Sequence, residues 1–223
     1  MGTSKALQGA ICRELGLAYP KSRVICSARE AAKAAQGFTF PVVVKPNVGG
    51  SGTGIRKFER MADLEEGASS GTIDLGVDHT GLVQEFLPAK DGHIVRVEIM
   101  NHEFLYAIRL PVLEESFNYC PADGCHITGM GYCPADGGTY PERELKIEAC
   151  VPPPDTVEAA KQIMAVSKAD LGGVEYLISE RDDRVYYYDI NPLSNFVADA
   201  PNIVGFDPVP RFVDFILERA GCS

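Results

Sequence analysis

The sequence predicts an α+β fold of two lobes with mixed, largely antiparallel sheets. Short apolar or alternating runs that predict strands recur along the chain, and several are joined by the short polar turns typical of antiparallel pairs. Segments with the helical spacing of apolar residues stand between and after these runs. The pattern changes after Gly81, so we expect an N-terminal lobe over residues 1–80 and a C-terminal lobe over residues 81–223.

The first lobe should begin with a helix over residues 4–16, for which Ser4 is a suitable N-cap. Residues 27–36 predict a second helix with a capping-box pattern. A buried strand (FPVVVKP), a glycine-rich loop (NVGGSGTG), a second strand (IRKFE) and a short helix over residues 61–70 should follow.

The second lobe should contain most of the strands. A hairpin at Asn101-His102 joins two of them, and a polar turn over residues 180–184 joins two others. Between these pairs, residues 111–154 are irregular and residues 155–171 predict a helix with Asp155 as its N-cap. The predicted strands are LVQEFLP, HIVRVEIM, EFLYAIRL, GGVEYLIS and RVYYYDIN, and PVPRFVDFILERA closes the chain as a helix.

Composition excludes several classes of function. The chain has 223 residues and 45% hydrophobic composition, which suits one globular unit, and no apolar run approaches the roughly 20 residues that span a bilayer. The net charge of −10 and the scattered basic residues argue against nucleic acid as the main partner. Seven cysteines without an export signal predict reduced thiols and a cytoplasmic protein.

Three cysteines lie in one loop around a short repeat, CPADG, at residues 120–124 and 133–137. The spacing of Cys120, Cys125 and Cys133 matches neither a structural zinc site nor a ferredoxin run. We therefore expect an ordered surface loop here, without a metal.

The glycine-rich loop after FPVVVKP is the strongest local signal for a ligand. Glycines let the backbone approach phosphate oxygens, and Lys45 would add a positive charge beside them. The loop lacks the Gly-Lys-Ser/Thr ending of a Walker motif, and a strand follows it where a dinucleotide fingerprint needs a helix. A lid over phosphates and an ordinary flexible hairpin both fit this segment alone.

Two later strands bring oxygen ligands to one face. Glu175 and Asp189 can share a side of the sheet, and Asn191 points the same way because strand side chains alternate with period two. Such a set suits Mg²⁺, and the apolar neighbours make a merely solvated pair less favourable. The strand VQEFLP, broken by a proline turn, could bind an adenine edge, although a core strand is the simpler interpretation.

In this order, the segments resemble the ATP-grasp superfamily over nearly the whole chain, from SKAL to the final helix. FPVVVKPNVGGSGTGI is similar to the family's strand, lysine and glycine loop. VQEFLP is similar to its adenine hinge, and GGVEYLI with YYYDINP to its paired metal-binding strands. The resemblance implies an ATP-grasp fold with the nucleotide bound between the two lobes. The implied cofactors are ATP and Mg²⁺, with Mn²⁺ as a substitute for Mg²⁺.

Residue by residue, the resemblance places Lys5 near the α-phosphate and Lys45 between the α- and β-phosphates. One or two Mg²⁺ ions would be held by Glu175, Asp189 and Asn191. The β/γ end would be covered by the loop residues Gly50, Ser51, Gly52, Thr53 and Gly54.

The resemblance also assigns the base, the ribose and the reacting groups. Asp91 or His93 would sit at the acidic ribose contact, and Arg96 and Arg109 would stabilise charge on the transferring phosphoryl group or acyl phosphate. The adenine hinge would comprise Gln84, Glu85, Phe86 and Leu87, with backbone groups of Glu85 and Leu87 facing the base.

The implied activity is an ATP-dependent ligase that joins a small-molecule carboxylate to an amine or thiol through an acyl phosphate. Alternatives are a nucleotide-binding regulatory or degenerate module without turnover and a carboxylase-type enzyme that makes carboxyphosphate. Asp189 stands where the family usually has Glu, and Gly173 stands where D-alanine–D-alanine ligases carry Arg. Complete enzymes usually have another domain before the first lysine. We therefore expect a fragment, a minimal form or one piece of a larger protein, with a further N-terminal domain or an oligomer partner supplying substrate contacts.

Overall fold

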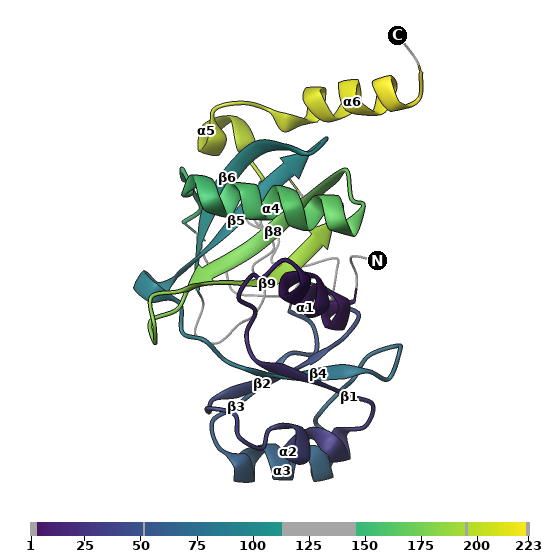
Figure 1. Cartoon of the computed structure of the whole chain (residues 1–223), viewed down its shortest axis with the longest axis vertical. Coiled ribbons are helices and arrows are strands. Elements are labelled where there is room, and N and C mark those ends of the chain that lie inside the picture. The colour runs from purple at the N-terminus through teal and green to yellow at the C-terminus, as the bar shows by residue number, and fades with distance from the viewer. Residues whose placement is uncertain (1–3, 51, 113–145, 195, 222–223) are drawn as a thin grey trace, which may run out of the picture.

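The computed structural model describes residues 4–50, 52–112, 146–194 and 196–221. Its strands form a four-stranded sheet in the order β1-β4-β2-β3 and a five-stranded sheet in the order β7-β6-β5-β8-β9, and neighbouring strands are antiparallel throughout both sheets. Figure 1 shows the two sheets in separate halves of the molecule, each with helices packed beside it. The predicted α+β fold is confirmed.

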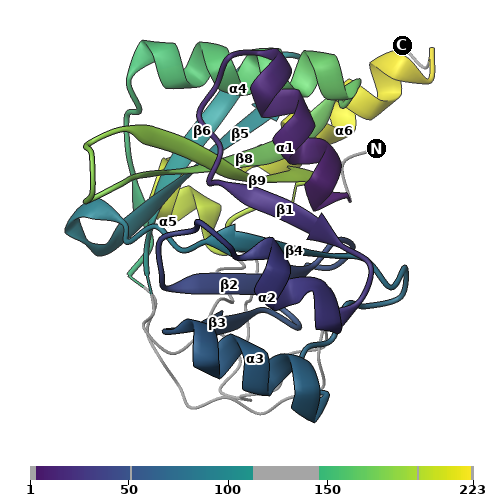
Figure 2. The same cartoon turned by 60° about the horizontal axis from the view of Figure 1, so that its bottom comes forward.

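The four-stranded sheet carries short helices on its outer face (Figure 2). Its central strand β2 is buried along its whole length, and Val42 and Val44 pack with Leu64 of α3 in the core beneath. The elements of this half are β1 (Ser22–Ile25), η1 (Ala28–Glu30), α2 (Ala31–Ala34), β2 (Val42–Pro46), β3 (Arg56–Phe58), α3 (Met61–Ser70) and β4 (Gly81–Glu85).

The five-stranded sheet has apolar layers on both faces. On one face, α4 and α1 pack against Val97 and Val174, whereas α5 packs near Ile108 on the other face. The elements are η2 (Lys90–Gly92), β5 (His93–Met100), β6 (Glu103–Pro111), β7 (Glu148–Ala149), α4 (Pro154–Ser167), β8 (Leu171–Ile178), β9 (Val185–Pro192), α5 (Ala200–Val204) and α6 (Pro208–Arg219).

Helix α1 (Lys5–Glu14) crosses between the two halves. It begins at the expected N-cap, Ser4, whose side chain accepts a hydrogen bond from the amide of Leu7. Its apolar face packs against the five-stranded sheet, although residues 1–80 were expected to form the other lobe. Its first turn is tied to the end of β2, because Asn47 Oδ1 accepts hydrogen bonds from Ser4 Oγ (2.9 Å) and from the amide of Ala6 (3.0 Å).

Several boundaries differ from the expectation. Strand β1 lies in a segment expected only to be extended, and β7 and α5 were not expected. Helix α4 starts at Pro154 with Pro153 as its N-cap, so Asp155 is a first-turn residue and not the cap. A proline fits this position because its fixed φ suits the first helical turn. None of the helices in the described part of the chain has the length and hydropathy needed to cross a membrane. The CPADG repeat lies outside the described residues.

Candidate functional site

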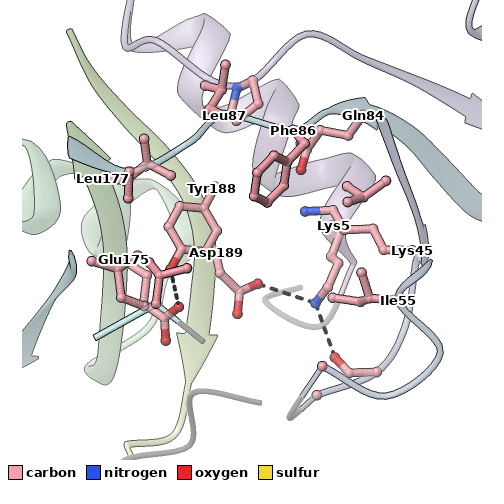
Figure 3. A pocket seen from close by; sticks show the side chains of 18 of the residues that line it. Lys5, Lys45, Ile55, Gln84, Phe86, Leu87, Glu175, Leu177, Tyr188 and Asp189 are labelled. Atoms are coloured by element: carbon pink, nitrogen blue, oxygen red, sulfur yellow. Dashed lines mark hydrogen bonds and ion pairs between the residues drawn. The ribbon is translucent and has the colours of Figure 1, made fainter. Parts of the chain in front are cut away.

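A cavity of about 240 Å³ lies between the two sheets, below the N-terminal end of α1 (Figure 3). Its walls come from the strand ends of both sheets, the glycine loop and the segment that follows β4. The sequence-predicted residues that line it are Lys5, Lys45, Gly50, Gly52, Thr53, Gln84, Glu85, Phe86, Leu87, Arg96, Glu175, Asp189 and Asn191. The structure thus brings most of the expected site together from six separate segments.

Two loop positions need separate mention. Gly54 is not among the lining residues, but its φ of 75° and its closeness to Pro46 explain why glycine is required: an added Cβ would lie 2.8 Å from Pro46 Cγ. Ser51 lies outside the described residues.

Arg109 is not brought to the cavity. The pairing of β5 with β6 shifts by one residue at Glu98, so Arg109 lies opposite Val95 and not opposite Ile94. A one-residue shift moves a strand's side chains to the opposite face of the sheet. Arg109 is exposed on the face that carries Val95 and Tyr176, whereas Arg96 lies on the cavity face. The expectation that Arg109 stabilises charge on the transferring phosphoryl group or acyl phosphate is therefore corrected, because its side chain lies on the other face of the sheet.

The two ribose candidates are not among the lining residues, although Ala89 and Ile94 on either side of them are. Asp91 is exposed in η2 with a φ of 56°, and its carbonyl oxygen lies 2.5 Å from His93 Nδ1. The neighbouring Lys90 pairs with Asp183 at 2.6 Å. This turn is therefore held by its own contacts beside the hinge, and the structure gives neither Asp91 nor His93 a place in the cavity.

Lysine 5 stands between the two halves of the cavity. Its Nζ lies 3.3 Å from Asp189 Oδ1 and donates to the carbonyl oxygen of Gly49 at 3.2 Å (Figure 3). The side chain is held there because the start of α1 is tied to Asn47. One ammonium group therefore links the glycine loop to the metal-ligand candidates.

Lysine 45 is buried at the end of β2, with 4% of its surface exposed. Within the described residues, no carboxylate lies within ion-pair distance of its Nζ, and the nearest aromatic partner is the Tyr19 ring, 5.9 Å away at its centroid. Burial and the neighbouring Lys5 lower its pKa to about 8, although Asp189 and Glu175 act in the opposite direction. The site therefore favours an incoming anion beside Lys45.

Three oxygen-bearing side chains meet on the opposite wall. Glu175 faces Asp189 across β8 and β9. Asn191 Nδ2 donates to Asp189 Oδ2 at 3.1 Å and lies 3.4 Å from Glu175 Oε1. Burial, followed by the Asp189 carboxylate, raises the pKa of Glu175, and Arg96 and Tyr188 oppose that shift. Among the described residues no cluster of three or more His, Cys, Asp or Glu occurs, so this set has two carboxylates and an amide.

Arg96 is buried beside Glu175. Its Nη1 donates to Glu175 Oε1 at 3.2 Å and its Nε donates to Glu98 Oε1 at 2.5 Å. Its guanidinium lies over Gly173, where an added Cβ would be 2.5 Å from Nε. Burial lowers the pKa of Arg96, but Glu98 and Glu175 outweigh burial and hold it above its ordinary value. Gly173 thus leaves the space that the Arg96 guanidinium fills.

The remaining wall is apolar and suits a flat ring. Phe86 and Leu87 follow β4 and line the cavity together with Ile94 and Leu177 of the other sheet. Figure 3 shows Phe86, Leu87 and Leu177 around the same end of the cavity. The Nε2 of Gln84 is buried without a hydrogen-bond partner within the described residues. A buried amide donor of this kind is satisfied when a ligand supplies an acceptor.

Two polar residues at or behind the cavity wall, Tyr188 and Glu98, were not expected from the sequence. Tyr188 lines the cavity and its hydroxyl donates to Glu175 Oε2 at 3.0 Å. It occupies the register shift between β8 and β9, so it lies on the side of Asp189 despite the alternation of strand side chains. Glu98 is fully buried behind Arg96. Its signal in the sequence was a charge inside the apolar strand HIVRVEIM.

Comparisons with known proteins identify the fold. No family model matches the chain. A formate-dependent phosphoribosylglycinamide formyltransferase from Bacteroides fragilis is 29% identical over 192 residues, which cover 84% of this chain and 44% of that protein. The chain therefore spans less than half the length of this curated relative.

Solved structures match nearly the whole chain. D-cycloserine synthetase DcsG gives a TM-score of 0.68 at 14% identity over 98% of this chain and 70% of its own. D-alanine–D-alanine ligase from Bacillus anthracis with ATP gives a TM-score of 0.67 at 16% identity, over 97% of this chain and 66% of its own. The ATP-grasp ligase PsnB with a minimal precursor gives a TM-score of 0.66 at 17% identity, over 98% of this chain and 61% of its own. On this architecture and on these matches, the chain has the ATP-grasp fold.

Proposed function

We propose that this chain binds Mg-ATP in the cavity between its sheets and forms the catalytic core of an ATP-dependent ligase. The observation that carries the proposal is the opposition of charges across one cavity. Lys5 and Lys45 approach it from the α1 and β2 side, and Glu175, Asp189 and Asn191 approach it from β8 and β9. The apolar wall adds a surface on which the base of a nucleoside triphosphate can pack.

The described residues fit a nucleotide. A buried ammonium without a carboxylate partner, Lys45, is stabilised by phosphate oxygens. The glycine loop brings backbone N–H groups to the same end of the cavity, where they can donate to phosphate. At the other end, Phe86 and Leu87 can pack on a base, and Gln84 Nε2 can donate to one of its acceptors.

The described residues also fit a magnesium ion. Glu175 and Asp189 offer carboxylate oxygens, which Mg²⁺ takes together with water and phosphate. Asn191 directs its Nδ2 at both carboxylates, so its amide would have to turn to offer its oxygen to the ion. A bound Mg²⁺ would neutralise phosphate charge and stabilise the leaving ADP. One PsnB structure was solved with Mg and ADP, which supports this choice of metal. Mn²⁺ prefers similar ligands and is a second candidate.

The proposed reaction joins a carboxylate to an amine or thiol. The substrate carboxylate attacks the γ-phosphorus, giving an acyl phosphate and ADP, and the amine or thiol then attacks the acyl carbon and releases phosphate. Lys5 and Lys45 hold the phosphates, and Arg96 faces the charge that develops on the transferred group. The loop residues Gly49, Gly50, Gly52 and Thr53 line the site, where they would limit the access of water to the acyl phosphate.

A binding module without turnover is the second candidate, and one observation favours it. Arg109, expected to take part in catalysis, lies on the opposite face of the sheet from the cavity. Under this alternative the chain binds Mg-ATP and produces no ADP with any carboxylate and acceptor. Release of ADP that depends on a carboxylate and an acceptor separates the ligase from the module.

The first test is thermal unfolding with Mg-ATP, with ATP plus EDTA, and with Mg²⁺ alone. Ligand at 100 times its dissociation constant should stabilise the protein by about 2.7 kcal/mol. We expect a shift that needs both ATP and Mg²⁺ and that is lost in Lys45→Ala and Asp189→Ala. Matched controls are Lys33→Ala and Asp214→Ala, because both side chains are exposed on outer helices. An unchanged melting temperature in the folded wild type would contradict the proposal.

A further inference from the structure

The buried carboxylate of Glu98 has no direct role in the proposed site. Its side chain has no exposed surface, and it lies on β5 two residues beyond Arg96. A buried carboxylate is costly unless it is paired and hydrogen-bonded. Both of its oxygens are engaged: Oε1 accepts from Arg96 Nε and Oε2 accepts from Ser194 Oγ, each at 2.5 Å.

These contacts fix the orientation of the Arg96 guanidinium. Glu98 holds Nε, Glu175 holds Nη1, and the backbone at Gly173 forms the floor beneath the planar group. No acceptor of the described residues bonds Nη2, although Arg96 lines the cavity. Within the described part of the chain, Nη2 is therefore the guanidinium nitrogen left to bond a ligand oxygen.

Ser194 connects this arrangement to the chain that follows β9. The same stretch is anchored a second time, because the amide of Val197 donates to the Tyr106 hydroxyl at 3.0 Å. Tyr106 lies opposite Glu98 in the pairing of β5 with β6. Glu98 thus touches Arg96 and Ser194, whereas Tyr106 holds the stretch without touching Arg96 through any hydrogen bond in the described structure.

We propose that Glu98, supported by Ser194, is a positioning residue that aims Arg96 at the terminal phosphate of the nucleotide. The inference rests on the proposed function, since it needs a nucleotide in the cavity. Planar, bidentate fixing of arginine gives geometric specificity as well as energy. The affinity gained from the γ-phosphate should then depend on Glu98, whereas affinity for ADP should not.

The test compares dissociation constants for Mg-ADP and for the magnesium complex of a non-hydrolysable ATP analogue, by calorimetric titration. The dissociation constant for Mg-ADP divided by that for the ATP analogue measures how much affinity the γ-phosphate contributes. Arg96→Met and Glu98→Leu should each lower this ratio by about tenfold, with ADP binding changed by less than about twofold. Glu98→Gln should stay within about threefold of wild type, because its amide oxygen still accepts from Arg96 Nε. The ratio for Ser194→Ala should lie between the ratios for Glu98→Leu and Glu98→Gln.

Tyr106→Phe is the matched control, because it releases Val197 but leaves Glu98 and Arg96 paired. It should lower the melting temperature and leave the ratio unchanged. The double variant Arg96→Met/Glu98→Leu should lose no more than Arg96→Met alone, since Glu98 acts through Arg96.

Other outcomes overturn the inference. If Glu98→Leu and Glu98→Gln weaken ADP and the ATP analogue equally, Glu98 is only structural. The same holds if the losses in the double variant add. If Glu98→Leu does not fold, Ser194→Ala with an unchanged ratio overturns the inference instead. A wild type that binds ADP but shows no gain from the γ-phosphate contradicts this inference alone. A folded wild type that binds neither nucleotide contradicts the proposed function and the inference with it.

Discussion

The two walls of the cavity differ in whether their buried charged and polar groups are paired within the protein. On the wall built by the four-stranded sheet, no described carboxylate pairs with the buried Lys45, and no described acceptor bonds Gln84 Nε2. On the wall built by the five-stranded sheet, Arg96, Glu98 and Glu175 form a continuous buried network. Among the described residues, the first wall leaves a buried ammonium and a buried amide donor without partners, whereas the second pairs its buried arginine with two carboxylates.

This difference separates binding from preorganisation. Unpaired buried donors cost stability in the free protein, so they indicate where a ligand is expected. A paired network holds its groups in place before the ligand arrives, which is what stabilisation of developing charge requires. Substitutions on the two walls should therefore have opposite effects on the stability of the free protein.

The largest expected effect is on the satisfied wall. Arg96→Leu leaves Glu98 and Glu175 buried without their cation, so we expect a loss of about 3–5 kcal/mol in the free energy of unfolding near pH 7. Lys45→Met should be neutral or stabilising, because it removes a buried charge that no carboxylate of the described residues pairs with. Urea unfolding without ligand measures both. Equal losses in the two variants would remove the contrast between the walls.

The next effect depends on pH and sharpens the contrast at Lys45. Its pKa is about 8 in the folded protein and near 10.5 when unperturbed. Between these values the unfolded chain binds more protons, so the stability contributed by this group rises with pH. The penalty at pH 7, up to about 3 kcal/mol, should thus shrink between pH 8 and 10.5. We expect Lys45→Met to exceed wild type in stability at pH 7 and to lose most of that advantage by pH 10.

The comparison variant for this series is Lys33→Met, because Lys33 is exposed on α2. Its difference from wild type should be small and independent of pH. A constant difference between Lys45→Met and wild type from pH 7 to 10 would show that Lys45 titrates normally.

The sequence predicted the fold well because the fold depends on local patterns. The strands and helices follow from apolar spacing, and the hairpin at Asn101-His102 is confirmed with both residues at positive φ. The short elements β1 and β7 were missed because they have few residues and pair at sheet edges. Pro153 and Pro154 were not recognised as the start of α4, and Asp155 was chosen as the cap instead.

The site was harder to predict because two register shifts change which face a residue occupies. Without the shift at Glu98, the hairpin would place Arg109 opposite Ile94, on the face of Arg96. Similarly, the shift beside Tyr176 places Tyr188 in the cavity. Alternation with period two predicts faces only while the register is constant. Nothing in the local sequence marked either shift, so residues beyond them could not be assigned a face.

A smaller effect is expected where Lys5 links the two walls. Its ammonium neutralises Asp189, so a metal ion without nucleotide has to compete with it. We expect Lys5→Gln to raise the affinity for Mg²⁺ alone by roughly tenfold, about 1.4 kcal/mol. Calorimetric titration of Mg²⁺ into nucleotide-free protein measures this. Lys161→Gln is the control, since Lys161 pairs with the exposed Glu103 at 2.9 Å. Unchanged affinity in Lys5→Gln would exclude Asp189 from the metal site.

The smallest effect should come from Gln84, the unsatisfied amide of the first wall. Gln84→Leu keeps most of the side-chain volume and removes the buried donor. The free energy of unfolding should therefore rise by up to about 1 kcal/mol. Affinity for Mg-ATP should fall about threefold to tenfold, because one hydrogen bond to the base is lost. Gln162→Leu, on the exposed face of α4, should change neither quantity. If Gln84→Leu instead lowers stability and leaves nucleotide affinity unchanged, Gln84 belongs to the core. On that wall, Lys45 would then be the buried group left to indicate a ligand.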